Sequence, residues 1–205
     1  MLEPYFIETQ IEVGVDEAGA GCLAGPVFAA AVIWPTELPQ EAIIDSRYKL
    51  IKDSKKLNKK NRELARDFII EYCISYSIQS IDHKYIDEHN ILNSRIKAMH
   101  VSIDNINIVP DFILVDGNRF KKYYTENNHL IDYKCFIKGD NKYISIAAAS
   151  ILAKTSRDDY MVNVAHELYP QYQFDTHKGY GTKKHYDAIK NHGVCPIHRL
   201  SFRLT

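Results

Sequence analysis

The apolar residues near the start of the chain follow two patterns that are typical of β-strands. Ile11, Val13 and Val15 occupy every second position, which indicates a strand that enters a core. Residues 27–33 are apolar without interruption, as expected of a strand that is buried on both faces. We therefore expect one strand at about residues 11–15 and a second one at 27–33.

The next segments alternate between irregular, helical and strand patterns. Residues 36–57 are polar and lack a regular period, so we expect an irregular connection. A helix is predicted to begin at Asn58 and to end at Tyr72. Its predicted apolar face consists of Leu64, Ala65, Phe68 and Ile69. Residues 73–81 return to a strand pattern.

The second half of the chain predicts two longer helices with short strands between them. The spacing of Ile91, Ile96, Met99 and Ile103 predicts a helix over residues 86–106. Short apolar runs predict strands at 112–115 and 133–137, and the last long helix is predicted over 143–168. This order of elements indicates an α/β protein. No repeat or linker divides the chain, so we expect one domain.

Four carboxylates lie at the ends of predicted strands or in the turns directly after them. Asp16 and Glu17 end the first strand, while Asp116 and Asp140 follow two strands of the second half. A single acid at such a turn is most often a cap or a solvated side chain. Four acids at equivalent places favour one shared site, because strand ends and the following loops carry the sites of α/β proteins. Carboxylate oxygens suit Mg²⁺, with Mn²⁺ as a similar fit.

Asp158 is an acid in a different setting. Ile144, Ile151 and Asp158 are spaced by seven residues, which places the acid on the buried stripe of the predicted helix. A buried carboxylate is costly unless it is paired. We therefore expect Asp158 to have a partner, either an arginine close in sequence or a backbone donor.

The glycine-rich turn after the first two acids has a competing interpretation. Gly19, Gly21 and Ala24 match the G-x-G-x-x-A fingerprint of dinucleotide-binding proteins. That fingerprint requires a helix, whereas Pro26 leads here into a β-branched, apolar run. The two acids before the turn would also repel a pyrophosphate. Both features disfavour a dinucleotide site.

Positive charge is concentrated in two segments, although the net charge of the 205 residues is zero. Residues 49–62 contain seven basic residues and one acid, a net charge of +6, and residues 177–205 contain six and one, a net charge of +5. A basic run is commonly a solvated face, and it is also the footprint of a nucleic-acid partner. Both interpretations stay open at this point.

The cysteines and the N-terminus indicate a cytoplasmic protein. The chain has no run of eighteen apolar residues and does not begin with the basic and then apolar pattern of a signal peptide. Its four cysteines form no C-x-x-C pair, so we expect reduced thiols and neither a zinc site nor disulfides. We expect a monomer that does not bind membranes.

The last third of the chain contains several histidines and a tyrosine between two glycines. The spacing of His177, His185, His192 and His198 fits no standard zinc pattern, so we expect them at a surface or facing nucleic acid, with one or two packed in the tail. The glycines beside Tyr180 would leave its ring unobstructed as a platform for a sugar or base. The alternative is that Tyr180 packs under its turn.

Seven segments of the chain, in this order, resemble the motifs of the bacterial ribonuclease HII family. They are GVDEAGAGCLAGPV, DSKKL, FILVDGN, KGD, SIAAASILAKTSRDDYM, HKGYGT and PIHRLSF. The resemblance spans nearly the whole chain. It implies a ribonuclease H-like α/β fold, with a mixed central β-sheet flanked by helices and a C-terminal helical extension. It also implies one catalytic domain over residues 1–205, in which the segment from about 170 to 205 contacts the substrate.

The resemblance implies a reaction as well as a fold. A member of this family would hydrolyse the RNA strand of RNA–DNA hybrids and nick duplex DNA at embedded ribonucleotides, leaving 5′-phosphate and 3′-hydroxyl ends. Asp16, Glu17, Asp116 and Asp140 correspond to the metal-binding acids of the family, which would hold two ions, Mg²⁺ or Mn²⁺, during catalysis. Asp158 corresponds to a position outside this set, so we expect it to be structural.

The resemblance also implies which residues recognise the substrate. The backbone of the family's Gly-Arg-Gly turn, which is Gly19, Ala20 and Gly21 here, senses the 2′-hydroxyl that distinguishes RNA from DNA. Tyr180 corresponds to a tyrosine that stacks on the next deoxyribose. The phosphate contacts expected in this chain are Lys55, Lys56, Lys178 and Arg199.

The opening motif departs from the family pattern at two positions. Ala20 replaces the central arginine, and Cys22 replaces a proline. Alanine keeps the backbone groups but has no guanidinium, so we expect activity with weaker binding or a softer preference for the RNA-to-DNA junction.

Two alternatives to this function stay open. One is a nucleic-acid-binding protein of the same fold that has lost catalysis. The other is a ribonuclease of the HIII type, which carries an extra N-terminal domain for which the residues before the first strand are too few.

Overall fold

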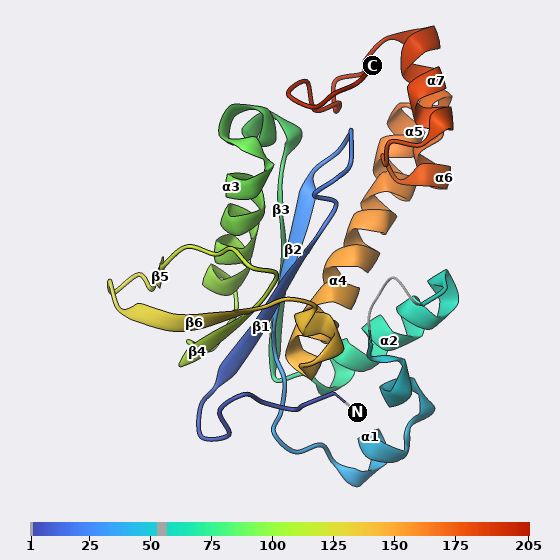
Figure 1. The fold of residues 1–205 in the computed structure, drawn as a ribbon. Helices are drawn as coiled ribbons and strands as arrows, with labels where there is room; N and C mark the ends of the chain where they lie inside the picture. The colour runs from blue at the N-terminus through green and yellow to red at the C-terminus, as the bar shows by residue number, and fades with distance from the viewer. Residues whose placement is uncertain (1, 53–56) are drawn as a thin grey trace.

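A mixed β-sheet forms the centre of the computed structural model, which describes residues 2–52 and 57–205 (Figure 1). Within these residues the strand order is β3-β2-β1-β4-β6-β5. The strands are β1 (Glu12–Ala18), β2 (Val27–Ile33), β3 (Ser75–Ile81), β4 (Phe112–Asp116), β5 (Tyr123–Tyr124) and β6 (Leu130–Phe136). β1, β4 and β6 run parallel to one another, whereas β2, β3 and β5 are antiparallel to their neighbours. The prediction of an α/β fold with a mixed sheet is confirmed.

Helices cover both faces of this sheet (Figure 1). The α-helices are α1 (Gln40–Ile44), α2 (Lys59–Tyr72), α3 (His83–Asp104), α4 (Ile144–Tyr160), α5 (His166–Leu168), α6 (Phe174–His177) and α7 (Lys183–His192). The shorter turns are the 3-10 helices η1 (Ser46–Leu50), η3 (Gly139–Asn141) and η5 (Pro170–Tyr172) and the π-helix η4 (Met161–Ala165). α3 packs on one face, and α4 with α2 on the other, while α5, α6 and α7 continue from the end of α4.

The central strand β1 is held between helices on its two sides. Nearly all of its residues are buried. A Cβ at Gly14 would overlap the backbone of Ser145, so glycine at this position lets α4 lie directly against the strand. The buried face of α4 is rich in alanine, which permits the same close approach. The strand that carries the first two predicted acids is therefore packed closely on both of its faces.

The C-terminal segment has its own apolar cluster. Met161 of η4, Phe174 of α6 and Ile189 of α7 pack together with Ile197 of the tail. Leu23, from the glycine-rich turn after β1, belongs to the same cluster. Residues almost 170 positions apart in sequence are thereby fixed beside each other.

Most predicted elements are present, and the differences have physical causes. The predicted strand at 27–33 and the helix after Asn58 are confirmed, and the Asn58 side chain accepts a hydrogen bond from the Asn61 amide at 2.9 Å. Leu64 was expected on the buried face of that helix but is exposed, because the narrow contact of α2 with α4 takes only Ala65, Phe68 and Ile69.

The segment expected to be irregular contains two short helices. α1 begins directly after Pro39, and η1 begins directly after its N-cap Asp45, whose carboxylate accepts a hydrogen bond from the Arg47 amide at 2.7 Å. Both helices are short and have little apolar periodicity, so the hydrophobic pattern did not show them; the Asp45 cap stabilises η1. None of the helices in residues 2–52 and 57–205 is long and apolar enough to cross a membrane.

Candidate active site

The predicted acids reach one edge of the sheet because three neighbouring strands run in the same direction. Asp16 and Glu17 lie near the end of β1, Asp116 is the last residue of β4, and Asp140 lies in η3, directly after β6. Parallel strands place their carboxyl ends at the same edge of a sheet. The strand directions thus explain how acids more than one hundred residues apart become neighbours.

Three of these acids line one pocket of about 280 Å³. They are Asp16, Glu17 and Asp116. The other lining residues come from the glycine-rich turn, from α4 and from the C-terminal segment: Ala18, Gly19, Ala20, Gly21, Ser150, Lys154 and Tyr180. Asp140 is not among the lining residues. It is linked to the pocket through its neighbour Gly139, whose amide donates to Asp116 Oδ1 at 2.8 Å.

The pocket is electrostatically unfavourable for its own acids. Burial raises the pKa of the Asp16 carboxyl well above its ordinary value, and repulsion from Glu17 and then from Asp116 raises it further. Hydrogen bonds from Ser150 and from the Glu17 amide, which donates to Asp16 Oδ1 at 2.7 Å, oppose this shift. Burial and repulsion therefore outweigh the hydrogen bonds at Asp16.

Arg95 is a residue of this site that sequence reasoning missed. Its Nη1 donates to Glu17 Oε1 at 2.9 Å, and both side chains are largely buried. Arg95 belongs to α3, which packs on the opposite face of the sheet from α4. A signal was present in the sequence, because Ile91, Arg95 and Met99 are four residues apart and share one face of that helix.

The carboxylate oxygens of the pocket are suitable ligands for a hard divalent cation, although they are not gathered around one point. Carboxylate oxygens are the preferred ligands of such ions, and a cation would relieve the repulsion that raises the pKa of Asp16. In the part of the chain that the structure describes, no three His, Cys, Asp or Glu side chains form a group that could hold an ion. Glu17 pairs with Arg95, and Asp140 accepts a hydrogen bond from Asn141 Nδ2 at 3.0 Å. Metal binding would therefore require these side chains to turn toward the pocket.

Two buried arginines hold the glycine-rich turn from behind. Arg157 of α4 donates to the carbonyls of Ala24 and Pro26, both at 3.2 Å, and to that of Lys178 at 2.9 Å. A Cβ at Gly19, whose φ is +92°, would overlap the Arg157 guanidinium. Glycine is therefore required there both for its backbone conformation and for space.

Arg199 holds the same turn from the C-terminal tail, which corrects its predicted role. It donates to the carbonyls of Ala20 and Gly25, both at 2.9 Å, and is 0% exposed. Burial lowers the pKa of Arg199 to about 10. A guanidinium that is enclosed and bonded to backbone carbonyls does not reach a phosphate, so the prediction of a phosphate contact is wrong for this residue.

The predicted lysines lie elsewhere. Lys178 is partly buried, its Nζ contacts the carbonyl of Asp175, and it lines a second pocket together with Arg62 and Asp158. Lys55 and Lys56 lie outside the described residues. Of the phosphate contacts expected from the sequence, none is therefore placed in the acidic pocket by the described residues.

Asp158 has the kind of partner that the sequence predicted, from a different place. Arg62 Nη1 contacts Asp158 Oδ2 at 3.1 Å, and Lys154 Nζ contacts Asp158 Oδ1 at 2.7 Å. The arginine comes from α2, 96 residues earlier in the chain, and not from the neighbourhood of Asp158. The paired carboxylate ties α2 to α4.

Tyr180 is only partly available in the pocket. Tyr180 is 38% exposed. Lys154 Nζ lies 5.3 Å from the centroid of its ring, and the guanidinium carbon of Arg157 lies 5.8 Å from it. Cys22 and Tyr180 pair as an antiparallel bridge, which joins the glycine-rich turn to the HKGYGT segment. The result lies between the two alternatives: one part of Tyr180 packs and the other faces the pocket.

The histidines contradict the expectation of a surface role. His177, His185 and His198 are buried, and only His192 of the four is exposed. The three buried rings pack around Phe174 in the C-terminal apolar cluster. Their spacing in sequence did not show this, because they come from two helices and the tail.

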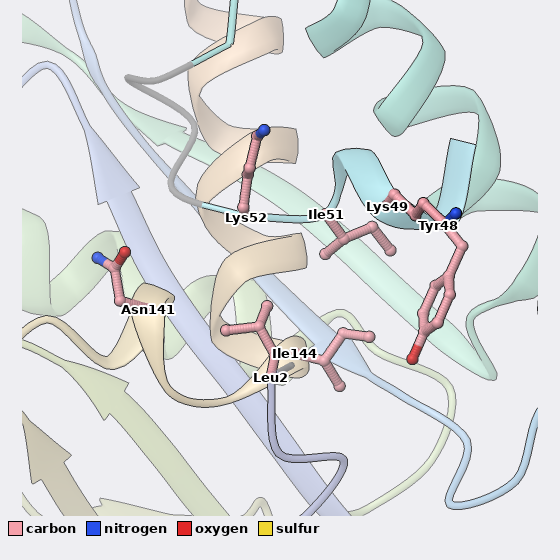
Figure 2. Close-up of a pocket in the computed structure, with 7 residues that line it drawn as sticks. All are labelled: Leu2, Tyr48, Lys49, Ile51, Lys52, Asn141 and Ile144. Atoms are coloured by element: carbon pink, nitrogen blue, oxygen red, sulfur yellow. The ribbon is translucent and has the colours of Figure 1, made fainter. Parts of the chain in front are cut away.

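A separate hollow beside α4 contains none of the predicted site residues. Figure 2 shows its lining: Leu2, Tyr48, Lys49, Ile51, Lys52, Asn141 and Ile144. One of these lining residues, Asn141, donates a hydrogen bond to Asp140. The hollow is therefore separate from the pocket that the predicted acids line.

Comparison with known proteins gives consistent results over the whole chain. The sequence profile of the family described as Ribonuclease HII matches residues 13–205. A protein named Ribonuclease HII from Phocaeicola vulgatus is 47% identical over 204 residues, covering 100% of this chain and 94% of the relative. A protein of the same name from Christiangramia forsetii is 50% identical over 200 residues, covering 97% and 94%.

Two solved structures share the fold. Ribonuclease H2 from Pyrococcus horikoshii has a TM-score of 0.73 and 24% identity, with 94% of each chain covered. RNase HII from Archaeoglobus fulgidus, solved in complex with PCNA, has a TM-score of 0.72 and 24% identity, with 95% of this chain and 96% of that chain covered. The arrangement of strands and helices described above is thus one that solved proteins adopt.

Proposed function

The chain belongs to the ribonuclease HII family, and we propose that it cuts RNA in the pocket lined by Asp16, Glu17 and Asp116. Membership of this family makes the protein an endoribonuclease that hydrolyses the RNA strand of RNA–DNA hybrids. The family profile and the similar curated relatives are those of ribonuclease HII. One observation carries the placement of the reaction: three of the four predicted acids, the glycine-rich turn and Tyr180 line the same pocket.

We propose that Asp16, Glu17, Asp116 and Asp140 hold two divalent ions, Mg²⁺ or Mn²⁺, during catalysis. When bound, such ions supply an activated water and stabilise the charge on the leaving oxygen, so that the products carry 5′-phosphate and 3′-hydroxyl ends. Asp16 is the acid that benefits most from a cation, because its anion is buried beside two other acids. Arg95 forms an ion pair with Glu17 and fixes the orientation of its carboxylate.

The glycine-rich turn is proposed to recognise the 2′-hydroxyl of the ribonucleotide. Gly19, Ala20 and Gly21 line the pocket, and Arg199 binds the Ala20 carbonyl from the buried side. The turn is therefore held rigidly, so contacts from its backbone need no rearrangement. A rigid backbone sensor can work without the arginine that the family has at position 20.

Tyr180 is proposed to stack on the sugar that follows the ribonucleotide. The C-terminal segment, from about residue 170 to 205, would then contribute to substrate binding mainly through this residue. The whole chain would act as one catalytic domain, because the apolar cluster of the C-terminal segment includes Leu23 from the turn after β1. Ribonucleotides embedded in duplex DNA would be substrates in addition to long hybrids.

A substrate panel tests this proposal. The protein is incubated with an RNA–DNA hybrid, a DNA duplex with one ribonucleotide and an all-DNA duplex, in Mg²⁺, in Mn²⁺ and in EDTA. We expect metal-dependent cleavage of the first two substrates, with 5′-phosphate and 3′-hydroxyl ends, and no cleavage of the third. Binding of hybrids without cleavage in either metal would instead support a non-catalytic nucleic-acid-binding protein.

A further inference from the structure

Three buried histidines lie together behind the Tyr180 turn: His185 and His198 share a hydrogen bond, and His177 stacks on His185. His177 at the end of α6, His185 in α7 and His198 in the tail are 7%, 0% and 1% exposed. The rings of His177 and His185 are stacked, with centroids 4.4 Å apart and an angle of 18° between their planes. These residues are outside the acidic pocket, and the mechanism above assigns them no role.

The partners of His177 define where its proton lies. Its Nε2 is 2.7 Å from the carbonyl oxygen of Tyr172 and must therefore donate. Its Nδ1 accepts from the amide of Gly179 at 3.2 Å. We assign the neutral ring with the proton on Nε2 from these two contacts. His177 thus holds the amide at the start of the Gly179-Tyr180-Gly181 turn.

His185 binds the other end of the same short segment. Its Nδ1 is 3.0 Å from the carbonyl oxygen of Tyr180 and donates to it, so its Nε2 is an acceptor. That Nε2 lies 3.1 Å from His198 Nε2, which must then donate. His198 Nδ1 accepts from the Cys195 amide at 2.8 Å, a shorter contact than the 3.3 Å to the Cys195 carbonyl oxygen.

All contacts are satisfied by one set of neutral rings. In that set, each accepting nitrogen faces an N–H donor, so a second proton on any ring would place two hydrogens against each other. Burial lowers the pKa of His177, His185 and His198, that of His185 to about 4, which keeps the rings neutral at neutral pH. Asp175 and Lys178 act on His177 with opposite signs, and His83 acts on His198.

We propose that His177 and His185 are positioning residues that set the place of the Tyr180 ring in the pocket, with His198 orienting His185. Between them the two rings hold the amide of Gly179, the residue before Tyr180, and the carbonyl of Tyr180 itself. The edges of both rings pack against Phe174, which prevents them from moving away. This inference rests on the proposed role of Tyr180 as a substrate platform.

Two substitutions of His185 separate the bond to Tyr180 from the bond to His198. In His185→Asn the amide nitrogen lies near the place of Nδ1 and can still donate to the Tyr180 carbonyl. In His185→Gln the longer side chain reaches the place of Nε2 and loses that donor. His192→Gln, in the same helix but exposed, is the matched control.

We expect His185→Gln to raise KM for the single-ribonucleotide duplex by about 10-fold or more, which is in the range of losses for residues that orient a binding group. The value of kcat should change by less than about twofold. His185→Asn should remain closer to the wild type, and His192→Gln should not differ from it. Equal effects of the Asn and Gln variants would overturn the inference, because a purely structural histidine does not distinguish them.

A double variant gives the decisive readout. If His185 acts through Tyr180, then His185→Gln adds no further rise in KM when Tyr180→Ala is already present. Effects that multiply in the double variant would overturn the inference. A raised KM in Tyr180→Ala together with an unchanged KM in His185→Gln would overturn the inference alone. A wild-type KM in Tyr180→Ala would overturn the platform role in the proposed function, and the inference with it.

Discussion

Asp16 is the residue whose environment depends most on a cation. Its pKa is raised by burial and by Glu17 and Asp116, so the folded protein holds this proton more strongly than the unfolded chain does. The sign follows from linkage: stability falls as pH rises from the ordinary aspartate value through the raised one. Above that window the ionised Asp16 destabilises the metal-free fold.

This environment gives a prediction for Asp16→Asn. In EDTA at neutral pH we expect the variant to melt higher than the wild type, by about 2–4 °C for each kcal/mol of relieved repulsion in a protein of this size. Adding Mg²⁺ or Mn²⁺ should raise Tm of the wild type more than that of the variant. Thermal melts of both proteins, with the exposed Asp132→Asn as control, make the comparison. A lower Tm for Asp16→Asn in EDTA would contradict this account.

Arg95 acts on the chemistry only through Glu17. Arg95→Gln removes their ion pair, so we expect cleavage to fall by about 10- to 100-fold, as is typical when a partner of a metal-ligating residue is lost. The control is Lys97→Gln, a change of the same kind two residues along α3 at an exposed position. Steady-state cleavage of the hybrid measures the effect, and equal rates for the two variants would show that Glu17 needs no orientation.

We propose that Ala20 affects substrate preference and not the chemistry. We expect Ala20→Arg to increase cleavage of the single-ribonucleotide duplex relative to a long hybrid, because it restores the side chain that the family has at this turn. Gln171→Arg adds the same charge at an exposed site outside the pocket and serves as control. The ratio of the two cleavage rates is the measurement, and identical ratios for Ala20→Arg and the wild type would contradict the expectation.

At the scale of elements, the turn between β1 and β2 is the part that holds the site together. Its carbonyls are bonded to Arg157 from α4 and to Arg199 from the tail. Neither guanidinium has solvent access, and their acceptors are backbone oxygens that would otherwise be buried without a hydrogen bond. The two arginines therefore serve the shape of the turn.

This assignment is tested with Arg199→Lys. Lysine cannot make both bonds, so we expect unfolding free energy to fall by about 1–3 kcal/mol, the usual consequence of leaving a buried polar group unsatisfied. The salt dependence of duplex binding should stay unchanged, since loss of a phosphate contact would reduce the slope by about one unit. Denaturant melts and binding at several salt concentrations measure the two effects. A reduced salt slope would restore the phosphate role that burial argues against.

Some elements were predictable from the sequence and others were not, for identifiable reasons. The strand 27–33 and the helix after Asn58 have strong local signals, an unbroken apolar run and an N-cap. The exposure of Leu64 depends on how narrow the α2 contact with α4 is, which no local pattern encodes. The π-helix η4 inside the predicted helix at 143–168 was likewise not encoded locally, because it occurs where the C-terminal apolar cluster packs on the chain.

At the scale of the whole molecule, the site is assembled from segments that are distant in sequence. The position of Asp16, Glu17, Asp116 and Asp140 at the ends of strands was enough to predict a shared site, and all but Asp140 line one pocket. The direction in which Arg95 and Arg199 point depends on packing between helices, tail and turn, so neither role was predicted. The buried histidines were missed for the same reason: they meet only after α6, α7 and the tail have packed together.

The central claim is that the acids at the edge of the sheet carry out the cleavage. It is tested most directly by the rate at which wild type, Asp16→Asn, Asp116→Asn and Asp132→Asn nick a duplex with one ribonucleotide in Mg²⁺. We predict nicking by the wild type and by Asp132→Asn. In Asp16→Asn and Asp116→Asn the nicking rate should fall by more than the roughly 100-fold loss that follows when only a partner of a metal ligand is changed. Nicking by Asp16→Asn and Asp116→Asn at the wild-type rate would contradict this account.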